Sequence, residues 1–368
     1  MNKKNNRHAT WLGAILAASI VAMPAFAEDK VVNVYNWADY IGSNVIANFE
    51  KETGIKVQYE NFESYETLDS KVLTGGSGYD VIFPDNTLAY HHIKAGLYQP
   101  LDKSKLSNLG NIDPLILKQM ALSDPGNQFV VPYMWWTNGV SYDVDKINAR
   151  MKDAPVDSLD MVFKPEIVSK FKDCGVMFLD SPGDVFGLAL KYLGKDPNSN
   201  DAGDIKAAAD LLMTVRPSVT RFDSVSQINA QADGSACLVI NWSGAVVQAK
   251  NRAAEAKNGI NIAYALPKEG ANIGFDGMAI PSDAPHPDAA LVFINYMLRP
   301  DVIAATTNEV AYANANRASW PLVKAELRDN PALFPDDKAK AGLYPAIPRS
   351  AEGLRELNRE WTRVKTGG

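Results

Sequence analysis

Two tryptophans, a tyrosine and two carboxylates stand at three junctions between a predicted strand and a predicted helix. The junctions are residues 36–40 (Asn-Trp-Ala-Asp-Tyr), 84–87 (Pro-Asp-Asn-Thr) and 241–244 (Asn-Trp-Ser-Gly). Carboxylates can neutralise a bound cation, and aromatic rings can cover its apolar part and attract it. Because ligands bind at the carboxyl ends of strands in open α/β sheets, two such sheets that face each other predict a binding cleft at these junctions.

Asp276 is a further candidate, since it lies in an otherwise small and apolar segment, Gly-Phe-Asp-Gly-Met-Ala at positions 274–279. An isolated carboxylate there needs a partner, because a buried unpaired charge is very unfavourable. We therefore favour a binding role for Asp276 over that of a solvated turn. For Asp39, a turn or helix-start carboxylate is an equal alternative. Single rings such as Trp242 and Tyr312 belong to a core more often than to a binding site.

Signatures of catalysis and of metal binding are missing from the sequence, which has no nucleophile elbow, no HExxH and no glycine-rich phosphate loop. The acids Asp39, Asp85 and Asp276 could imitate the carboxylate pair of a glycosidase, but the neighbouring aromatic residues favour binding. The adjacent His91 and His92 project in different directions from regular structure, which is typical of a surface pair. We expect no enzymatic activity, no metal and no cofactor.

Strand and helix signals alternate along the chain and predict the α/β fold class. Strands are expected at residues 31–35, 55–62 and 80–83, with a helix at 44–52 capped by Ser43 and ended by Gly54, and another at 65–73 after Ser64. Further elements are expected as a helix from Ser181-Pro182, helices at 204–215, 244–256, 287–298 and 300–308, strands at 236–240 and 260–265, and an apolar stretch at 277–281. This order predicts a mostly parallel sheet covered by helices.

The first 27 residues have the pattern of a cleaved export signal. A basic start is followed by an apolar run at residues 11–23 and by Ala25-Phe26-Ala27, which suits a signal peptidase. Without residues 1–27 the net charge changes from −6 to −9, because three basic and no acidic residues are lost. An acidic chain argues against nucleic acid as a partner. We expect a periplasmic protein of two domains whose mature chain does not insert into a membrane.

Cys174 and Cys237 are the two cysteines of the chain. In an oxidising compartment such a pair usually forms one disulfide, whereas two buried free thiols are the alternative. A redox role is not expected, because the CxxC spacing is missing.

Segments in every part of the mature chain resemble the bacterial periplasmic polyamine-binding proteins, which bind putrescine and spermidine. These segments are Tyr-Asn-Trp-Ala-Asp-Tyr at 35–40, Asn-Phe-Glu-Lys-Glu-Thr-Gly-Ile-Lys-Val at 48–57, Pro-Tyr-Met-Trp at 132–135, Tyr-Leu-Gly-Lys-Asp-Pro-Asn-Ser at 192–199 and Tyr-Ala-Asn-Ala-Asn at 312–316. Helix and strand signals alone would fit many α/β proteins, whereas this combination of segments is specific.

The resemblance implies a receptor of two lobes that closes on its ligand and passes it to an inner-membrane ABC permease. It implies an N-terminal lobe of residues 28–135 and 256–303 and a C-terminal lobe of residues 136–255 and 304–368. Both cysteines fall where the putrescine-binding members carry a disulfide. We expect a monomer, with a chemoreceptor in place of the permease as the alternative partner.

Ligand contacts are expected from both lobes, with Asp276 as the acid that binds an amine most directly. For Asp184, which is Glu in the family, the alternative of a capping box with Ser181 is slightly favoured. Trp135 and Trp136 could form a further wall or belong to the core. The expected ligand-binding residues are Trp37, Ala38, Asp39, Tyr40, Asp85, Asp184, Trp242, Asp276 and Tyr312.

Three positions depart from the family pattern. Ala245 replaces an Asp, Asp85 replaces a small hydroxyl residue, and Gly274 replaces Phe, which is expected to enlarge the pocket. Asp85 could supply the charge lost at 245. Alternatively, Ala245 leaves a helix N-terminus that favours an anion. The ligand is therefore expected to be a polyamine, with an ω-amino acid as the alternative.

Overall fold

The computed structural model describes Met1 and residues 30–335 and 341–368 of the chain. Apart from Met1, the predicted export signal lies outside the described residues. The strands are β1 Val31–Trp37, β2 Lys56–Phe62, β3 Val81–Ile82, β4 Val130–Asp143, β5 Val176–Phe178, β6 Arg221–Phe222, β7 Leu238–Trp242, β8 Ile262–Ala265, β9 Ala271–Ala279, β10 Ala313–Asn314 and β11 Leu343–Pro345.

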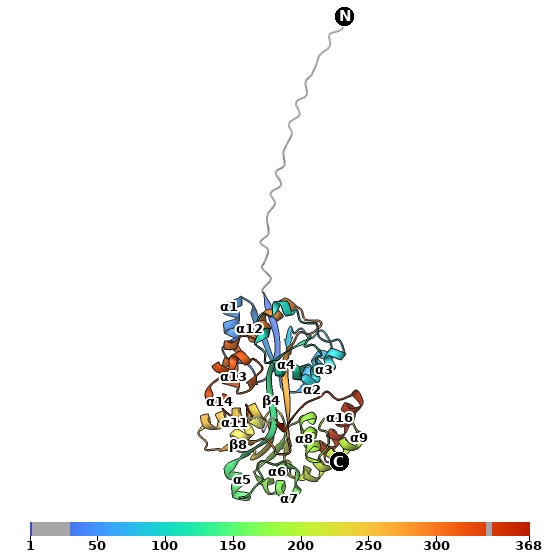
Figure 1. Cartoon of the computed structure of the whole chain (residues 1–368), viewed down its shortest axis with the longest axis vertical. Helices are drawn as coiled ribbons and strands as arrows, with labels where there is room; N and C mark the ends of the chain where they lie inside the picture. The colour runs from blue at the N-terminus through green and yellow to red at the C-terminus, as the bar shows by residue number, and fades with distance from the viewer. Residues whose placement is uncertain (2–29, 336–340) are drawn as a thin grey trace.

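Helices lie around these strands in both lobes (Figure 1). The α-helices are α1 Val45–Thr53, α2 Tyr65–Leu73, α3 Asn86–Lys94, α4 Pro114–Met120, α5 Val144–Arg150, α6 Asp160–Phe163, α7 Pro165–Val168, α8 Pro182–Tyr192, α9 Ala202–Val215, α10 Gln227–Ala232, α11 Ser243–Ala256, α12 Pro287–Met297, α13 Pro300–Val310, α14 Ala325–Arg328 and α16 Ala351–Thr366. Short 3-10 helices span Lys103–Lys105, Leu109–Asn111, Ser169–Cys174, Arg216–Ser218 and Arg317–Leu322.

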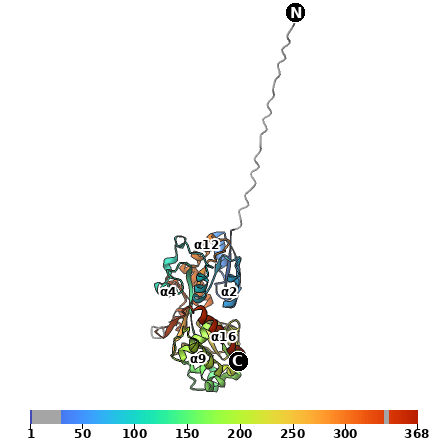
Figure 2. The same cartoon turned by 90° about the vertical axis from the view of Figure 1, so that its right-hand side faces the viewer.

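The chain folds into two lobes, each with its own hydrophobic core. Val34, Phe49 and Phe293 belong to the core of the N-terminal lobe, and Phe186 and Leu212 to that of the C-terminal lobe. In Figure 1 the N-terminal lobe, with α1, α3 and α12, lies above the C-terminal lobe, with α5 to α9 and α16, and Figure 2 shows the same division from the side. The expected two-lobed α/β fold is confirmed, and the exact lobe boundaries at residues 135, 255 and 303 stay a prediction.

The long strand β4 connects the two lobes. Its residues 130–137 pair with β9 and residues 138–142 with β7, both antiparallel. The strand order is β2-β1-β3-β9-β4-β7-β5-β6, in which β1 is parallel to β2 and β3, and β5 is parallel to β6 and β7. The expectation of a mostly parallel sheet is therefore wrong at β4 and β9. The chain leaves the N-terminal lobe along β4 and returns along β9, so these two strands run in opposite directions.

The elements around the predicted junctions match the sequence pattern closely. Helix α2 has the expected bounds, and the Ser64 side chain accepts a hydrogen bond from the Thr67 N–H at 3.2 Å. Helix α1 ends at Gly54, whose φ of 70° is in the left-handed region that favours glycine. The predicted Ser43 cap of α1 is wrong, because the Ser43 N–H and hydroxyl both donate to Glu309, at 2.9 and 3.1 Å.

Cys174 and Cys237 form the expected disulfide, with 5.5 Å between their Cα atoms. Both residues are buried, and the bond joins the segment before β5 to the segment before β7. It therefore ties together two parallel neighbours of the C-terminal sheet.

In the described part of the chain, no single helix is long and apolar enough to cross a membrane. Helices α12 and α13 are together long and apolar enough to cross a membrane, but they are bent by 74° relative to each other.

Candidate functional site

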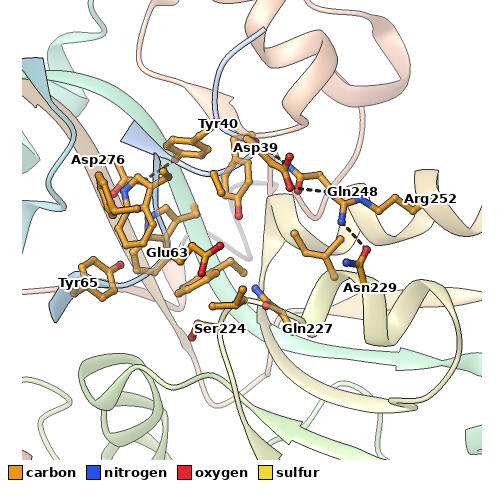
Figure 3. Close-up of a pocket in the computed structure, with 18 residues that line it drawn as sticks. Asp39, Tyr40, Glu63, Tyr65, Ser224, Gln227, Asn229, Gln248, Arg252 and Asp276 are labelled. Carbon is orange, nitrogen blue, oxygen red and sulfur yellow. Dashed lines mark hydrogen bonds and ion pairs between the residues drawn. The ribbon is translucent and has the colours of Figure 1, made fainter. Parts of the chain in front are cut away.

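A cavity of about 280 Å³ lies between the lobes (Figure 3). The loop after β1 and the strand β9 line it from the N-terminal lobe, and α10 and α11 line it from the C-terminal lobe. Seven of the nine expected ligand-binding residues line this cavity: Trp37, Ala38, Asp39, Tyr40, Trp242, Asp276 and Tyr312. The structure brings these residues together, and their contacts with a ligand stay predictions.

The two tryptophans of the cavity are held in the same way in both lobes. Trp37 ends β1 and Trp242 ends β7, and each follows an asparagine that is completely buried. The Trp37 N–H donates to Oδ1 of Asn36 at 2.8 Å, and the Trp242 N–H donates to Oδ1 of Asn241 at 2.9 Å. Each bond fixes the backbone at the carboxyl end of its strand, so the ring that follows lines the cavity.

Asp276 is buried, with 4% of its surface exposed, and only one of its carboxyl oxygens is occupied. The Tyr40 hydroxyl donates to Oδ2 at 2.6 Å, whereas Oδ1 has no well-aligned donor among the described residues. Burial, and to a lesser degree the charge of Asp85, raises the pKa of Asp276 to about 8. The Trp136 side chain nevertheless lies close enough to the carboxyl group to oppose part of the rise of its pKa. The side chain is therefore neutral in the empty site at pH 7 and can ionise when a cation approaches.

Trp136 forms a wall of the cavity, whereas Trp135 packs against Phe334 with 5.9 Å between ring centroids. The Trp136 ring occupies the space next to Gly274, where a Cβ atom would lie 2.2 Å from Cζ2 of the indole. The expectation that Gly274 enlarges the pocket is therefore wrong. Glycine at this position admits the Trp136 ring, which fills the space that a larger side chain would take.

Gly244 allows an equally close approach at the start of α11. A Cβ atom on Gly244 would lie 2.4 Å from the Tyr312 ring, which packs edge-on against Tyr40 with 4.9 Å between centroids. The absence of a side chain at 244 therefore places the Tyr312 ring in the cavity, beside the tyrosine that holds Asp276.

Gly244→Ala should lower the free energy of unfolding by about 1–3 kcal/mol, because the new methyl group overlaps a buried ring. Displacing Tyr312 should also weaken ligand binding. Urea denaturation of the unliganded protein checks the first effect. Gly183→Ala is the matched control, since a Cβ atom there meets nothing within 4 Å and the glycine also lies in the first turn of a helix. Equal stability of the two variants would contradict the proposed role of Gly244.

Asp85 and Asp184 do not line this cavity but a neighbouring one of about 220 Å³. Tyr65 and Trp136 line both cavities and separate them. Asp85 caps α3: its carboxylate accepts from the Leu88 N–H at 2.6 Å. Burial raises the pKa of Asp85 to about 6. The carboxylate thus serves the helix, and its expected replacement of the charge lost at 245 stays a prediction.

Asp184 supports the wall of the first cavity from behind. It accepts hydrogen bonds from Nε1 of Trp242 and from Nδ2 of Asn272, both at 3.0 Å, and from the Ser181 hydroxyl at 2.8 Å. The favoured capping box is wrong, because the Ser181 side chain caps no backbone N–H of α8. The donors at Trp242 and Asn272 come from outside α8, so the motif alone could not reveal them.

Asp39 and Arg252 join the lobes at the mouth of the cavity. The backbone of Asp39 has a φ of 53°, in the left-handed region. Its carboxylate accepts a hydrogen bond from the Arg252 guanidinium at 2.7 Å. Gln248, one helical turn before Arg252, donates to the Asp39 carbonyl at 3.2 Å. Asp39 already has a cation as partner, so Asp276 is the lining acid better able to receive one from a ligand.

Ala245 is completely buried in the first turn of α11. Burial raises the pKa of the Tyr312 hydroxyl. The Ala245 N–H lies close to this hydroxyl and opposes a smaller part of that rise in pKa. This helix N-terminus therefore already faces a hydroxyl oxygen, which weakens its expected role as an anion site.

Several polar residues of the cavity were not predicted from the sequence. Glu63 directly follows β2, so the strand-end rule that identified Trp37 and Trp242 could have found it. The polar lining residues on α10 and α11 do not follow a strand end, and only the packing of the lobes places them at the cavity. The unpredicted polar residues include Glu63, Ser224, Gln227, Asn229, Gln248 and Arg252.

Comparison with known families and proteins is consistent with this geometry. Residues 44–335 match the family of bacterial extracellular solute-binding proteins. The chain is 47% identical to the putrescine-binding periplasmic protein PotF of Escherichia coli K12, over 100% of this chain and 99% of that protein. It is 45% identical to the putrescine-binding periplasmic protein SpuD of Pseudomonas aeruginosa, over 97% of this chain and 98% of that protein.

A solved structure shares the whole architecture. The putative spermidine/putrescine ABC transporter protein of Listeria monocytogenes superimposes with a TM-score of 0.81 at 31% identity, over 91% of this chain and 99% of that chain. The resemblance that the five sequence segments indicated is confirmed.

Proposed function

Because the chain belongs to the family of bacterial extracellular solute-binding proteins, we propose that it captures a small protonated amine between its lobes and delivers it to an inner-membrane ABC permease. The ligand is a polyamine such as putrescine or spermidine, the compounds named for its relatives. The protein acts in the periplasm as a monomer, after residues 1–27 have been removed.

The observation that carries this proposal is the unoccupied oxygen of Asp276 in a cavity with aromatic walls. An ammonium group can donate to Oδ1, which has no partner among the described residues. Trp37, Trp242 and Tyr312 offer ring faces and edges to the methylene chain, and each cation–π contact contributes roughly 1–2 kcal/mol when desolvated.

An ω-amino acid is the second candidate, with its amine at Asp276 and its carboxylate near Arg252. The presence of a guanidinium among the lining residues favours this possibility. The Arg252 guanidinium is, however, bound to Asp39, and this pairing leaves less of its charge for a carboxylate. A diamine therefore agrees better with the cavity. Delivery of the ligand signal to a chemoreceptor remains an alternative to the permease.

A thermal-shift screen against 1,4-diaminobutane, spermidine, agmatine, 4-aminobutyrate, choline and amino acids tests the proposal. At about a thousand times its Kd, a ligand should stabilise the protein by roughly 4 kcal/mol, which raises the Tm by several degrees. We expect the diamines and spermidine to give this shift. If no amine shifts the midpoint, or only the amino acids do, the proposed ligand class is wrong.

A further inference from the structure

Three oxygen-bearing side chains line the cavity at a distance from Asp276. Glu63 follows β2 in the N-terminal lobe, whereas Gln227 begins α10 in the C-terminal lobe and Ser224 lies three residues before it. In Figure 3 these three lie together on one side of the group of lining residues, and Asp276 with Tyr40 lies on the other. The cavity therefore has two polar ends with aromatic walls between them.

Gln227 is buried without a partner for its amide. Its surface is only 2% exposed, and no hydrogen bond joins the side chain to any residue that the structure describes. The hydroxyl oxygen of Ser224 is likewise buried and unpaired within the described ranges. Buried polar groups are almost always hydrogen-bonded, so two unpaired groups on one cavity wall are available to a ligand.

Glu63 is the charged member of this cluster. It forms no ion pair and no side-chain hydrogen bond within the described part of the chain. It follows Phe62, which pairs with Trp37 in the parallel register of β1 and β2. The Trp37 ring packs against Phe62 with 4.4 Å between centroids and against Tyr65 with 4.9 Å. The Glu63 side chain is exposed, and it lines the same cavity as these three rings.

We propose that Glu63, Ser224 and Gln227 form a second ammonium subsite, so that the ligand is an α,ω-diamine or a longer polyamine held at both ends. An ammonium group has three N–H donors, and a carboxylate, a hydroxyl and an amide oxygen are three acceptors. The amide of Gln227 accepts when its oxygen is turned towards the cavity. The subsite supplies the second charge that Ala245 cannot, and it rests on the proposed amine-binding function.

Titration of two ligands that share one end separates the two subsites. n-Butylamine has the chain of 1,4-diaminobutane with only one ammonium group, so it can occupy only one end of the cavity. Asp276→Asn identifies that end as the Asp276 end if it abolishes the binding of n-butylamine. Glu63→Gln should lower the affinity for 1,4-diaminobutane by about tenfold, and Gln227→Met should lower it by about fivefold. The affinity for n-butylamine should change by less than about twofold in both variants. Glu66→Gln is the control. It removes one negative charge only three residues further along the chain, and the Glu66 side chain lines the neighbouring cavity and not this one.

Isothermal titration calorimetry of the wild type and the four variants with both ligands decides the matter. A loss confined to 1,4-diaminobutane in the Glu63 and Gln227 variants supports the subsite. An unchanged ratio of the two affinities, or an equal loss for both ligands, overturns it while leaving the proposed function intact. If the wild type binds no amine at all, the proposed function and the subsite fail together.

Discussion

Asp276→Asn should weaken the binding of 1,4-diaminobutane by about a hundredfold to several thousandfold. The variant keeps the shape of the side chain but cannot carry the negative charge that an ammonium group in a water-excluded site requires. Removing one member of a buried charge pair costs roughly 3–5 kcal/mol, which corresponds to a change of this size in the dissociation constant. Calorimetric titration at pH 8 measures the loss directly.

The same variant should leave the unliganded protein at least as stable as the wild type, because asparagine is neutral in both the folded and the unfolded state, whereas Asp276 must take up a proton on folding at pH 7. Because burial raises the pKa of Asp276 to about 8, the side chain is already uncharged in the empty site at pH 7, and asparagine resembles that state. Asp145→Asn is the matched control: it removes one charge from an exposed residue at α5, outside the cavity. Equal affinity of the Asp276 and Asp145 variants for the diamine would exclude Asp276 from the site.

The affinity for a diamine should fall as the pH is lowered below about 8. The ammonium groups of an alkyl diamine remain protonated up to about pH 9, as the ordinary lysine pKa indicates, so the protein is the partner that titrates. Binding requires ionised Asp276, whose pKa in the empty site is about 8. Each unit well below that value should therefore weaken binding by about tenfold, and the affinity should fall by about fiftyfold between pH 8, where half of the Asp276 side chains are ionised, and pH 6.

The acidic groups that face Asp276 modify this dependence. Tyr40 holds one carboxyl oxygen, and the charges of Asp85 and Asp184 add to the rise of the Asp276 pKa. As Asp85 has a pKa of about 6, its protonation below that pH weakens the repulsion and should make the lowest part of the profile less steep. Titrations from pH 5 to 9 in two buffers of different protonation heat should show this change of slope and the release of nearly one proton at pH 7. An affinity that is independent of pH, without proton release, would contradict the mechanism.

The stability of the empty protein should have the opposite dependence on pH. An acid whose folded pKa is raised contributes stability that is fully present below its unfolded value, about 3.9, and is lost as the pH rises through the folded value. For Asp276 this loss should occur between about pH 4 and pH 8. The stabilisation by a diamine should consequently be larger at pH 8 than at pH 6.

Sequence reasoning located the cavity because its main walls obey local rules. Trp37 and Trp242 each end a strand whose apolar pattern is legible, and the carboxyl ends of such strands meet at a cleft. Helix α2 was predicted with its cap, since Ser64 and the apolar spacing after it are local signals. Local signals predicted the Ser64 cap of α2 and the end of α1 at Gly54 correctly, whereas the predicted Ser43 cap of α1 did not form because Ser43 binds the distant Glu309.

The errors concern contacts between residues that are far apart in the chain. Gly274 was expected to open the pocket, but the Trp136 ring from the neighbouring strand β4 fills that space. Asp184 was expected to cap α8, but Trp242 and Asn272 approach it from β7 and β9. No local pattern encodes which distant side chain arrives at a given position, because packing of the whole lobe decides it.

The crystal structure of the protein with 1,4-diaminobutane tests the central claim most directly. We predict that one ammonium nitrogen lies about 3 Å from Oδ1 of Asp276 and that the methylene chain lies between Trp37 and Trp242. A diamine bound outside this cavity, with Asp276 in contact only with Tyr40, would contradict the account.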